Sequence, residues 1–294
     1  MEHQVTINSE NVQLPQEQRP IVDILKKAVL YIILLGIAAF MILPFVWMIS
    51  ASIKPSNDVF NFPIQWIPKT IRWQNFNDIW KEINFLTYYK NTIWLTLVIT
   101  FNVIFSSSLA AYAFAKIQFP ERKILFIFYI LTMAIPVQVI MIPQYIMMKQ
   151  IFHLSDSLWA LVLIESFSPF GVFLLRQFYM GIPNEILEAA RIDGLSEFGI
   201  YLKVILPLSK PALSSLAIFE FNFVWNDFLY PLIFLTSDQN KTIQLGIRKF
   251  ITEFGVEYGL IMAASVCALI PVVIMYLLFQ NYFIQGISTT GLKG

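Results

Sequence analysis

The sequence predicts an all-α, polytopic membrane protein with about six transmembrane helices, and three observations support that class. Hydrophobic residues make up 57% of the 294 residues and charged residues only 13%, against about 25% charged residues in a soluble domain. The apolar residues occur in continuous runs of about 20, the length of a helix that crosses a hydrocarbon core of about 30 Å. These runs lack the alternation of polar and apolar residues that is typical of membrane β-strands, so helices are expected.

Six apolar stretches are long enough to span a bilayer. The third is interrupted by Pro136 and Pro143, the fourth carries Glu165, and the fifth carries Glu220 and Asp227. The stretches are residues 28–50, 92–114, 124–147, 158–175, 212–235 and 260–283.

The spans divide the chain into a polar N-terminal segment, a membrane domain and a short tail. An even number of spans places both termini on one side of the membrane. Lys26 and Lys27 directly precede the first span and the loop 115–123 is basic, so the positive-inside rule favours cytoplasmic termini. The three parts are residues 1–27, 28–283 and 284–294.

Several classes of function are not expected. The net charge of +1 gives no reason to expect nucleic acid as a partner. His3, His153 and Cys267 lack the spacing of metal ligands. The sequence contains no G-x-x-x-x-G-K-[ST] loop, no G-x-S-x-G and no H-E-x-x-H, so we expect no enzyme and no cofactor bound by this chain.

Two segments outside the spans are long, residues 51–91 and 236–259. The first contains Trp66, Trp73 and Trp80. Such a segment either packs on the membrane surface or meets an extracellular partner, and the sequence leaves both possibilities open.

A charged segment, residues 183–211, separates the fourth and fifth spans and predicts two short helices. Pro183 suits a first helical turn, with Asn184 available as a cap. Asp193 and Gly194 end the first helix, because glycine tolerates the left-handed conformation of such an ending. Ser196 can cap a second helix over residues 197–206, with Phe198, Leu202 and Ile205 on one face. From these patterns alone, an interfacial hairpin that merely connects two spans remains possible.

This segment resembles the EAA motif of importer-type ABC transporter permeases. Val204 stands where isoleucine is commoner, and Leu195 where alanine often follows the glycine. The resemblance implies a coupling helix that docks on a cytosolic ATPase, and therefore a cytosolic loop. The matching residues are Glu188, Ala189, Ala190, Gly194, Val204, Leu206 and Pro207, and we add Asp193 to the predicted coupling set.

Other stretches resemble maltose-type carbohydrate permeases, namely residues 111–116, 173–183 and 225–228. The tail 286–294 resembles that of the smaller maltose permease subunit, which implies that Gly291, Leu292, Lys293 and Gly294 contact the ATPase. The implied partners are a second homologous permease, two cytosolic ATPase subunits that hold ATP and magnesium, an extracytoplasmic solute-binding protein, membrane lipid and a carbohydrate. The implied location is a bacterial-type cell membrane.

Polar residues within the spans are the candidate translocation path. A carboxylate in hydrocarbon costs about 2.5–3.5 kcal/mol, so such groups face the interior of a helical bundle or a wet cavity. Glu165, Glu220, Asn226 and Asp227 are predicted to line the path, with Asn222 as a further candidate. The alternative is that these groups only join helices to each other, or contact a partner across the interface between permease subunits.

The resemblance therefore implies a permease subunit of an ATP-driven importer for a carbohydrate, working by alternating access. Two alternatives remain open. One is an ABC permease for another solute such as glycerol phosphate. The other is an ion-coupled secondary transporter that uses Glu165 and Glu220 as ion sites, although such proteins often show internal repeats and this sequence shows none.

Overall fold

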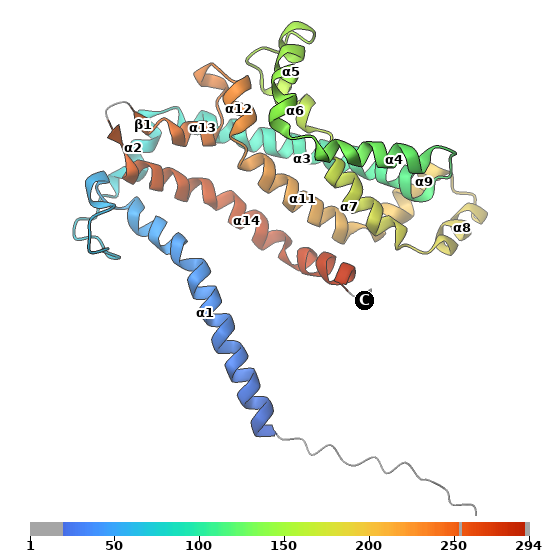
Figure 1. Ribbon diagram of the computed structural model, residues 1–294, viewed down its shortest axis with the longest axis horizontal. Helices are drawn as coiled ribbons and strands as arrows, with labels where there is room; N and C mark the ends of the chain where they lie inside the picture. Colours follow the sequence, from blue (N-terminus) through green and yellow to red (C-terminus); the bar gives the residue numbers. More distant parts are fainter. Residues whose placement is uncertain (1–19, 253–254, 292–294) are drawn as a thin grey trace, which may run out of the picture. The chain divides into compact units, whose positions relative to one another are not determined.

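A computed structural model describes residues 20–252 and 255–291, and the side chains of residues 24–252 and 255–280 within them. The chain divides into two units, residues 1–47 and 48–294, which are described separately. Figure 1 shows the order of the elements along the chain.

The described part of the first unit consists of most of one helix. Helix α1 runs from Pro20 to Ser52, so it begins inside the segment 1–27 that was predicted to be polar and cytoplasmic. All side chains from residue 24 to residue 46 are exposed, and nearly all of them are apolar. A helix that is apolar on every side is expected where lipid is the solvent. Residues 1–19 lie outside the described part of the chain.

The described residues confirm the all-α membrane fold. Four helical segments are long and apolar enough to cross a membrane, and there are up to six if each of two bent pairs forms one span. The four are Ile24–Ser52 within α1, Phe85–Lys116 (α3), Leu158–Met180 (α6, Leu158–Glu165, and α7, Pro169–Met180) and Tyr258–Gln280 within α14 (Tyr258–Gly291).

The first bent pair is the predicted third span. Helix α4 (Arg122–Leu131) continues through a short turn, and the direction then changes by 98° into α5 (Val137–Gln150). The break lies at Pro136, as predicted, because proline donates no backbone hydrogen bond and disfavours the helical conformation of the residue before it. Ile135 is indeed extended. Pro143 lies inside α5 and does not end it.

The predicted fifth span, residues 212–235, is not one continuous helix. Helix α11 (Lys210–Trp225) ends at Asn226, and a short helix α12 (Leu229–Phe234) follows. An Asp227 carboxylate oxygen accepts the backbone N–H of Leu229 at 3.0 Å and so competes with continuous helical hydrogen bonding. Pro231 donates no backbone hydrogen bond of its own, which further weakens a helix through this point.

Helix α3 is central to the second unit. It packs along α7 and α11, and α11 packs in turn against α14 (Figure 1). One buried cluster contains Tyr112 from α3, Leu175 from α7 and Leu216 from α11. The same cluster includes Leu187 and Ile200, so the hydrophobic core continues from the spans into the charged segment that follows α7.

The segment after α12 is fixed to α3 by polar contacts. It contains α13 (Ile243–Arg248) and two short antiparallel strands, β1 (Ile251–Thr252) and β2 (Gly255–Val256). Asp238 accepts hydrogen bonds from Lys249, from the Tyr88 hydroxyl at 2.8 Å and from Asn84 at 2.7 Å. The Lys249 ammonium holds the pKa of the Asp238 carboxyl well below its usual range.

The other long segment contains α2 (Gln74–Glu82), which packs against α14. Its buried Asn75 donates hydrogen bonds to the backbone oxygens of Ser52 and Lys54. Trp66, Trp73 and Trp80 remain exposed. Whether lipid or a partner covers these rings stays a prediction.

Gly246 of α13 lies directly against the buried ring of Tyr88, and a Cβ atom there would come within 2.5 Å of Tyr88 Cδ2. Because Asp238 holds this ring by its hydroxyl, we expect Gly246→Ala to overpack the contact and to lower stability by about 1–3 kcal/mol. The thermal midpoint of the purified protein measures this loss. Gly36→Ala is the matched control, since a Cβ atom at Gly36 meets nothing within 4 Å. Equal midpoints for the two variants would contradict the described packing.

Candidate functional site

A cavity of about 770 Å³ lies between the broken helices of the second unit. Four regions of the fold line it: the turn between α4 and α5 with α5 itself, the turn between α6 and α7, the last turns of α11, and α12. The lining residues are Thr132, Met133, Val137, Ile140, Gln144, Ile164, Glu165, Phe167, Ser168, Pro169, Phe170, Phe219, Glu220, Asn222, Phe223 and Tyr230. The cavity is therefore mostly apolar and aromatic, with a few polar groups among them.

Some of the polar groups, Glu165 and Ser168 among them, come from the places where helices break. Ser168 caps α7 by accepting the Gly171 N–H at 3.1 Å, and Pro169 occupies the first helical turn, as is favourable for both residue types. The same Ser168 hydroxyl donates to Glu220 Oε1 at 2.8 Å. The side chain of Glu220 is therefore fixed against the turn between α6 and α7, and only 8% of Glu220 is exposed.

Glu165 ends α6 and also lines the cavity. Its Oε1 atom is buried and has no hydrogen-bond donor among the described residues. The carboxyl group interacts instead with that of Asp227. Across the cavity wall, the Tyr230 hydroxyl donates to Gln144 Oε1 at 3.0 Å, which joins α12 to α5. A carboxyl oxygen without a donor is costly to bury, which marks Glu165 as a group that a ligand could satisfy.

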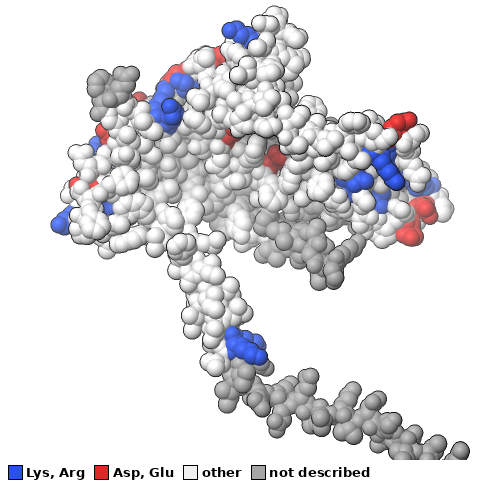
Figure 2. All heavy atoms as spheres, in the orientation of Figure 1, with Lys and Arg blue, Asp and Glu red and all other residues white. Residues whose placement is uncertain are grey.

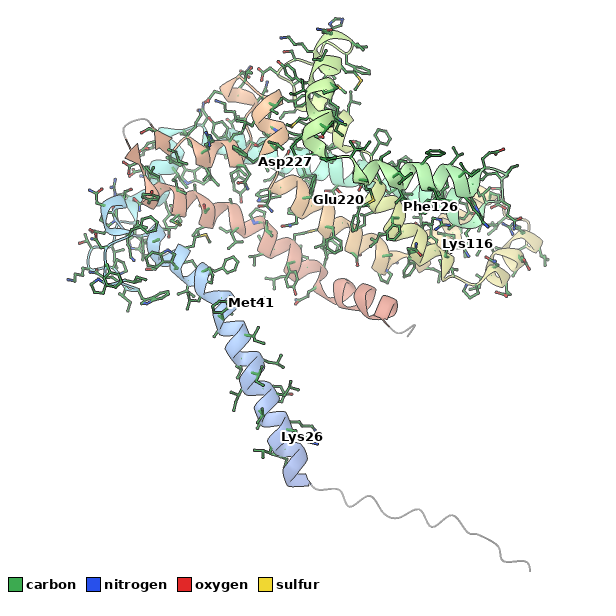
Figure 3. All side chains as sticks on the ribbon, viewed as in Figure 1. Lys26, Met41, Lys116, Phe126, Glu220 and Asp227 are labelled. Carbon is green, nitrogen blue, oxygen red and sulfur yellow. The ribbon has the colours of Figure 1, made fainter. Side chains whose placement is uncertain are left out.

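The structure separates the four residues that were predicted to line the path. Glu165 and Glu220 line the cavity, and so does Asn222, whereas Asn226 and Asp227 do not (Figure 3 labels Glu220 and Asp227). Asn226 is exposed and donates to the Asn222 side chain at 3.0 Å. Asp227 holds the start of α12, as described above. The sequence analysis missed Ser168, Gln144 and Tyr230; the Ser168–Pro169 pair was the available signal for a helix start inside a span.

The charged segment forms the two predicted helices and is called the hairpin from here on. Helix α8 runs from Asn184 to Ile192. The second arm is α9 (Glu197–Ile200), a π-helical turn over Tyr201–Ile205, and α10 (Leu206–Leu208). Gly194 has a φ of +85°, which confirms the predicted left-handed turn.

The predicted caps have different outcomes. Ser196 accepts the Gly199 N–H at 3.2 Å, as expected for a cap. Asn184 does not cap α8; it is the first helical residue, and its side chain accepts a hydrogen bond from Lys116 at 2.8 Å. The predicted common face is also wrong, because Ile205 is buried whereas Phe198 and Leu202 are exposed. The π-helical turn changes the periodicity on which that prediction depended.

Most residues of the predicted coupling set lie on the surface of the hairpin. Glu188, Ala189, Asp193, Gly194 and Pro207 are exposed, whereas Ala190 is buried and Leu206 is partly buried. The neighbouring Ile192 is 86% exposed, an unusual position for isoleucine in a charged helix. Figure 2 shows acidic and basic side chains gathered at this end of the molecule. The hairpin thus offers a surface with both charged and apolar groups.

Polar contacts fix the hairpin to α3. The Tyr112 hydroxyl of α3 donates to Glu197 Oε2 at 2.7 Å, and Arg191 of α8 donates to Glu197 Oε1 at 2.8 Å. The Lys116 ammonium, at the end of α3, donates to the Ile182 carbonyl at 2.6 Å. A buried chain of hydroxyls also joins Tyr201 of the hairpin to Ser108 of α3 at 2.9 Å. Sequence reasoning did not find these contacts.

The predicted tail contacts are only partly within the described chain. Gly291 is the last residue of α14. Leu292, Lys293 and Gly294 lie outside the described residues, so their role stays a prediction.

Taken together, the broken spans, the cavity and the braced hairpin define a polytopic helical transport protein. Residues 102–289 match the family model described as "Binding-protein-dependent transport system inner membrane component". The chain belongs to this family, and it is a multi-pass transport permease rather than an enzyme.

Named relatives have similar sequences over nearly their whole length. The chain is 34% identical to the arabinooligosaccharides transport system permease protein AraQ of Halalkalibacterium halodurans, over 88% of this chain and 93% of the relative. It is 33% identical to the sn-glycerol-3-phosphate transport system permease protein UgpE of Yersinia pestis, over 87% and 93% of the two chains.

Two solved structures have a similar fold. A chain of a bacterial ABC transporter that imports the acidic polysaccharide alginate aligns with a TM-score of 0.77 and 24% identity, over 92% of this chain and all of that chain. A chain of the alginate transporter in complex with a pentasaccharide-bound periplasmic protein aligns with a TM-score of 0.66 and 17% identity, over 88% and 95%. These likenesses support the fold.

The brace between α3 and the hairpin is testable. Tyr112→Phe removes the hydrogen bond to Glu197, and a bond to a charged group contributes about 1.5–3 kcal/mol. We expect faster amide hydrogen exchange across residues 184–208, measured by mass spectrometry. Tyr145→Phe is the control, since the Tyr145 hydroxyl has no hydrogen-bond partner among the described residues. Unchanged exchange in Tyr112→Phe would show that the bond does not hold the hairpin.

Proposed function

We propose that this chain is one permease subunit of an ATP-driven ABC importer that carries a carbohydrate into the cytoplasm. The observation that carries the proposal is the hairpin, with Glu188 and Ala189 exposed at its surface while Glu197 fixes it to α3. A charged hairpin that only connected two spans would need no polar brace to a membrane helix. A hairpin that passes motion from a partner protein to the spans does need such a polar contact with a membrane helix.

The proposed mechanism passes motion from an ATPase to the cavity. The exposed residues of the hairpin dock on a cytosolic ATPase subunit, which holds ATP and magnesium. Because the hairpin shares a core with α3, α7 and α11, a rigid-body displacement of the hairpin moves those helices. Ser168 of the cavity wall is bonded to Gly171 of α7 and to Glu220 of α11. A displacement of these two helices therefore reaches the cavity wall. Alternating exposure of the cavity to the two sides of the membrane follows.

The proposed topology and partners are those of such an importer. Both termini lie in the cytoplasm, since the hairpin and the two termini are on the same side of an even number of spans. A second permease, two ATPase subunits and an extracytoplasmic solute-binding protein complete the complex. The family name and the alginate transporter solved with its periplasmic protein support the solute-binding partner.

A carbohydrate is the proposed solute for two reasons. The relative AraQ is named for arabinooligosaccharides. The cavity combines the aromatic rings of Phe167, Phe170, Phe219 and Phe223 with a few polar groups, a lining that suits the apolar faces and hydroxyls of a sugar. The relative UgpE is named for sn-glycerol-3-phosphate, but the lining of this cavity contains no lysine, arginine or histidine to bind a phosphate group.

Coupling through the hairpin is tested by Gly194→Ala. A side chain at a φ of +85° is strained by about 1–2 kcal/mol. We expect sugar-stimulated ATP hydrolysis by the complex, purified through a tag on this chain, to fall by about 5- to 30-fold. The matched control is Gly199→Ala in the same hairpin, since a Cβ atom there makes only ordinary contacts. If no ATPase copurifies with the unaltered chain and uptake follows an ion gradient, the proposed function is wrong.

The cavity is tested by Glu220→Gln. The amide keeps the shape of the carboxylate but weakens acceptance from sugar hydroxyls, so we expect uptake of arabino-oligosaccharide to fall by about fivefold or more. Assembly and stimulated ATP hydrolysis should remain largely intact, because Glu220 is remote in the fold from the hairpin surface. Glu121→Gln, an exposed carboxylate before α4, is the control. Uptake unchanged by Glu220→Gln would remove Glu220 from the path.

A further inference from the structure

The ionisable residues that line the cavity are all acidic. Two of its lining residues are carboxylic acids, Glu165 and Glu220, and none of the lining residues is lysine, arginine or histidine. A third carboxyl, that of Asp227, interacts with Glu165 from behind the lining. The wall therefore presents acid groups with no basic group beside them.

We infer that this cavity selects its solute by charge: it admits uncharged or amino-bearing carbohydrates and excludes anionic ones such as sugar phosphates and uronic acids. The inference rests on the proposed function, in which the solute crosses the membrane through this cavity. It names a solute class within that function and assigns the selection to Glu165 and Glu220.

The hydrogen-bond chemistry of the wall supports this choice. Glu165 Oε1 is buried without a donor among the described residues, and the Glu165 carboxyl group interacts with that of Asp227. Within the part of the chain that the structure describes, Ser168 is the one hydrogen-bond donor to Glu220. Sugar hydroxyls and ammonium groups bring donors, whereas phosphate and carboxylate groups bring mainly acceptors. The first kind of solute satisfies the acceptor atoms of the wall, and the second kind leaves them without donors.

The basic residues of the surrounding helices have other partners. Arg176 of α7 donates to the Phe114 carbonyl and lies over the Phe126 ring. Arg122 of α4 donates to the Ile117 carbonyl. Lys149 of α5 lies over the Tyr145 ring. None of these three residues lines the cavity, and neither do Lys123 of α4 and Lys210 of α11.

The inference separates this chain from two proteins that it resembles. UgpE is named for sn-glycerol-3-phosphate, and the transporter of similar fold imports the acidic polysaccharide alginate. Both solutes are anions. An anion in the cavity of this chain would meet Glu165 and Glu220 with no cation to balance it.

The test measures charge selection with a thiol placed in the cavity. Asn222 is exposed within the lining, and Cys267 is the single cysteine of this chain, so Cys267→Ser with Asn222→Cys leaves one reporter thiol in this chain of the complete complex, whose labelling is read on this subunit. The probes are a cationic trimethylammonium-ethyl and an anionic sulfonato-ethyl methanethiosulfonate. We expect the ratio of cationic to anionic reaction rates, divided by the same ratio for a free thiol, to be about tenfold or more.

Substitution of the acid groups provides the decisive comparison. In a chain that also carries Glu165→Gln and Glu220→Gln, the normalised ratio should fall towards one. A control thiol at Thr70→Cys, exposed in the segment before α2, should keep its ratio in both backgrounds. A ratio near one before substitution, a ratio unchanged by the two substitutions, or no reaction with either probe would overturn the inference.

Uptake by the same complex separates this inference from the proposed function. ATP-dependent uptake of a neutral arabino-oligosaccharide together with no charge preference at residue 222 would leave the permease function standing and reject charge selection. Strong charge preference without ATP-dependent uptake of any carbohydrate would reject the proposed function. The labelling ratio needs no solute-binding protein, so the selectivity of that protein does not enter it.

Discussion

The link between the hairpin and the spans centres on the hydrogen bond between Tyr112 of α3 and Glu197, beside the buried core that the two parts share. Helix α3 packs against both α7 and α11, and the Ser168–Glu220 hydrogen bond joins the residue that caps α7 to a residue of α11. Because Glu197 also binds Arg191, one carboxylate holds both arms of the hairpin to the helix at the centre of the bundle. In the proposed mechanism, a force on the hairpin surface reaches the cavity through this continuous, packed path.

The broken spans follow from the rule that backbone groups in lipid need internal partners. At each break a side chain supplies such a partner. Ser168 accepts a backbone N–H at the start of α7, and Asp227 accepts one at the start of α12. These breaks also bring the carboxyl groups of Glu165 and Glu220 to one cavity. Helix interruption and the polar wall are thus two results of the same local chemistry.

The sequence was informative where the signal is local. Apolar runs of membrane length, Pro136 at a bend and Gly194 at a left-handed turn were all predicted correctly. The break at residues 226–228 was not, because Asn226 and Asp227 lie in a run whose length and hydropathy suit a full span. The brace could not be predicted either, since Tyr112 and Glu197 are 85 residues apart and only the packing of α3 brings them together. The same is true of Gln144 and Tyr230. Their side chains meet only because breaks in two spans bring α5 and α12 together.

The central claim is that the hairpin and α3 move as one body. Spin labels at Ile192→Cys on the hairpin and Phe105→Cys on α3, both exposed positions, test it in the Cys267→Ser background of the complete complex. The distance distribution between the two labels, measured with and without ATP by pulsed electron paramagnetic resonance, should be the same in both states. A shift or a broadening with ATP would show that the hairpin moves independently of α3 and would contradict the account.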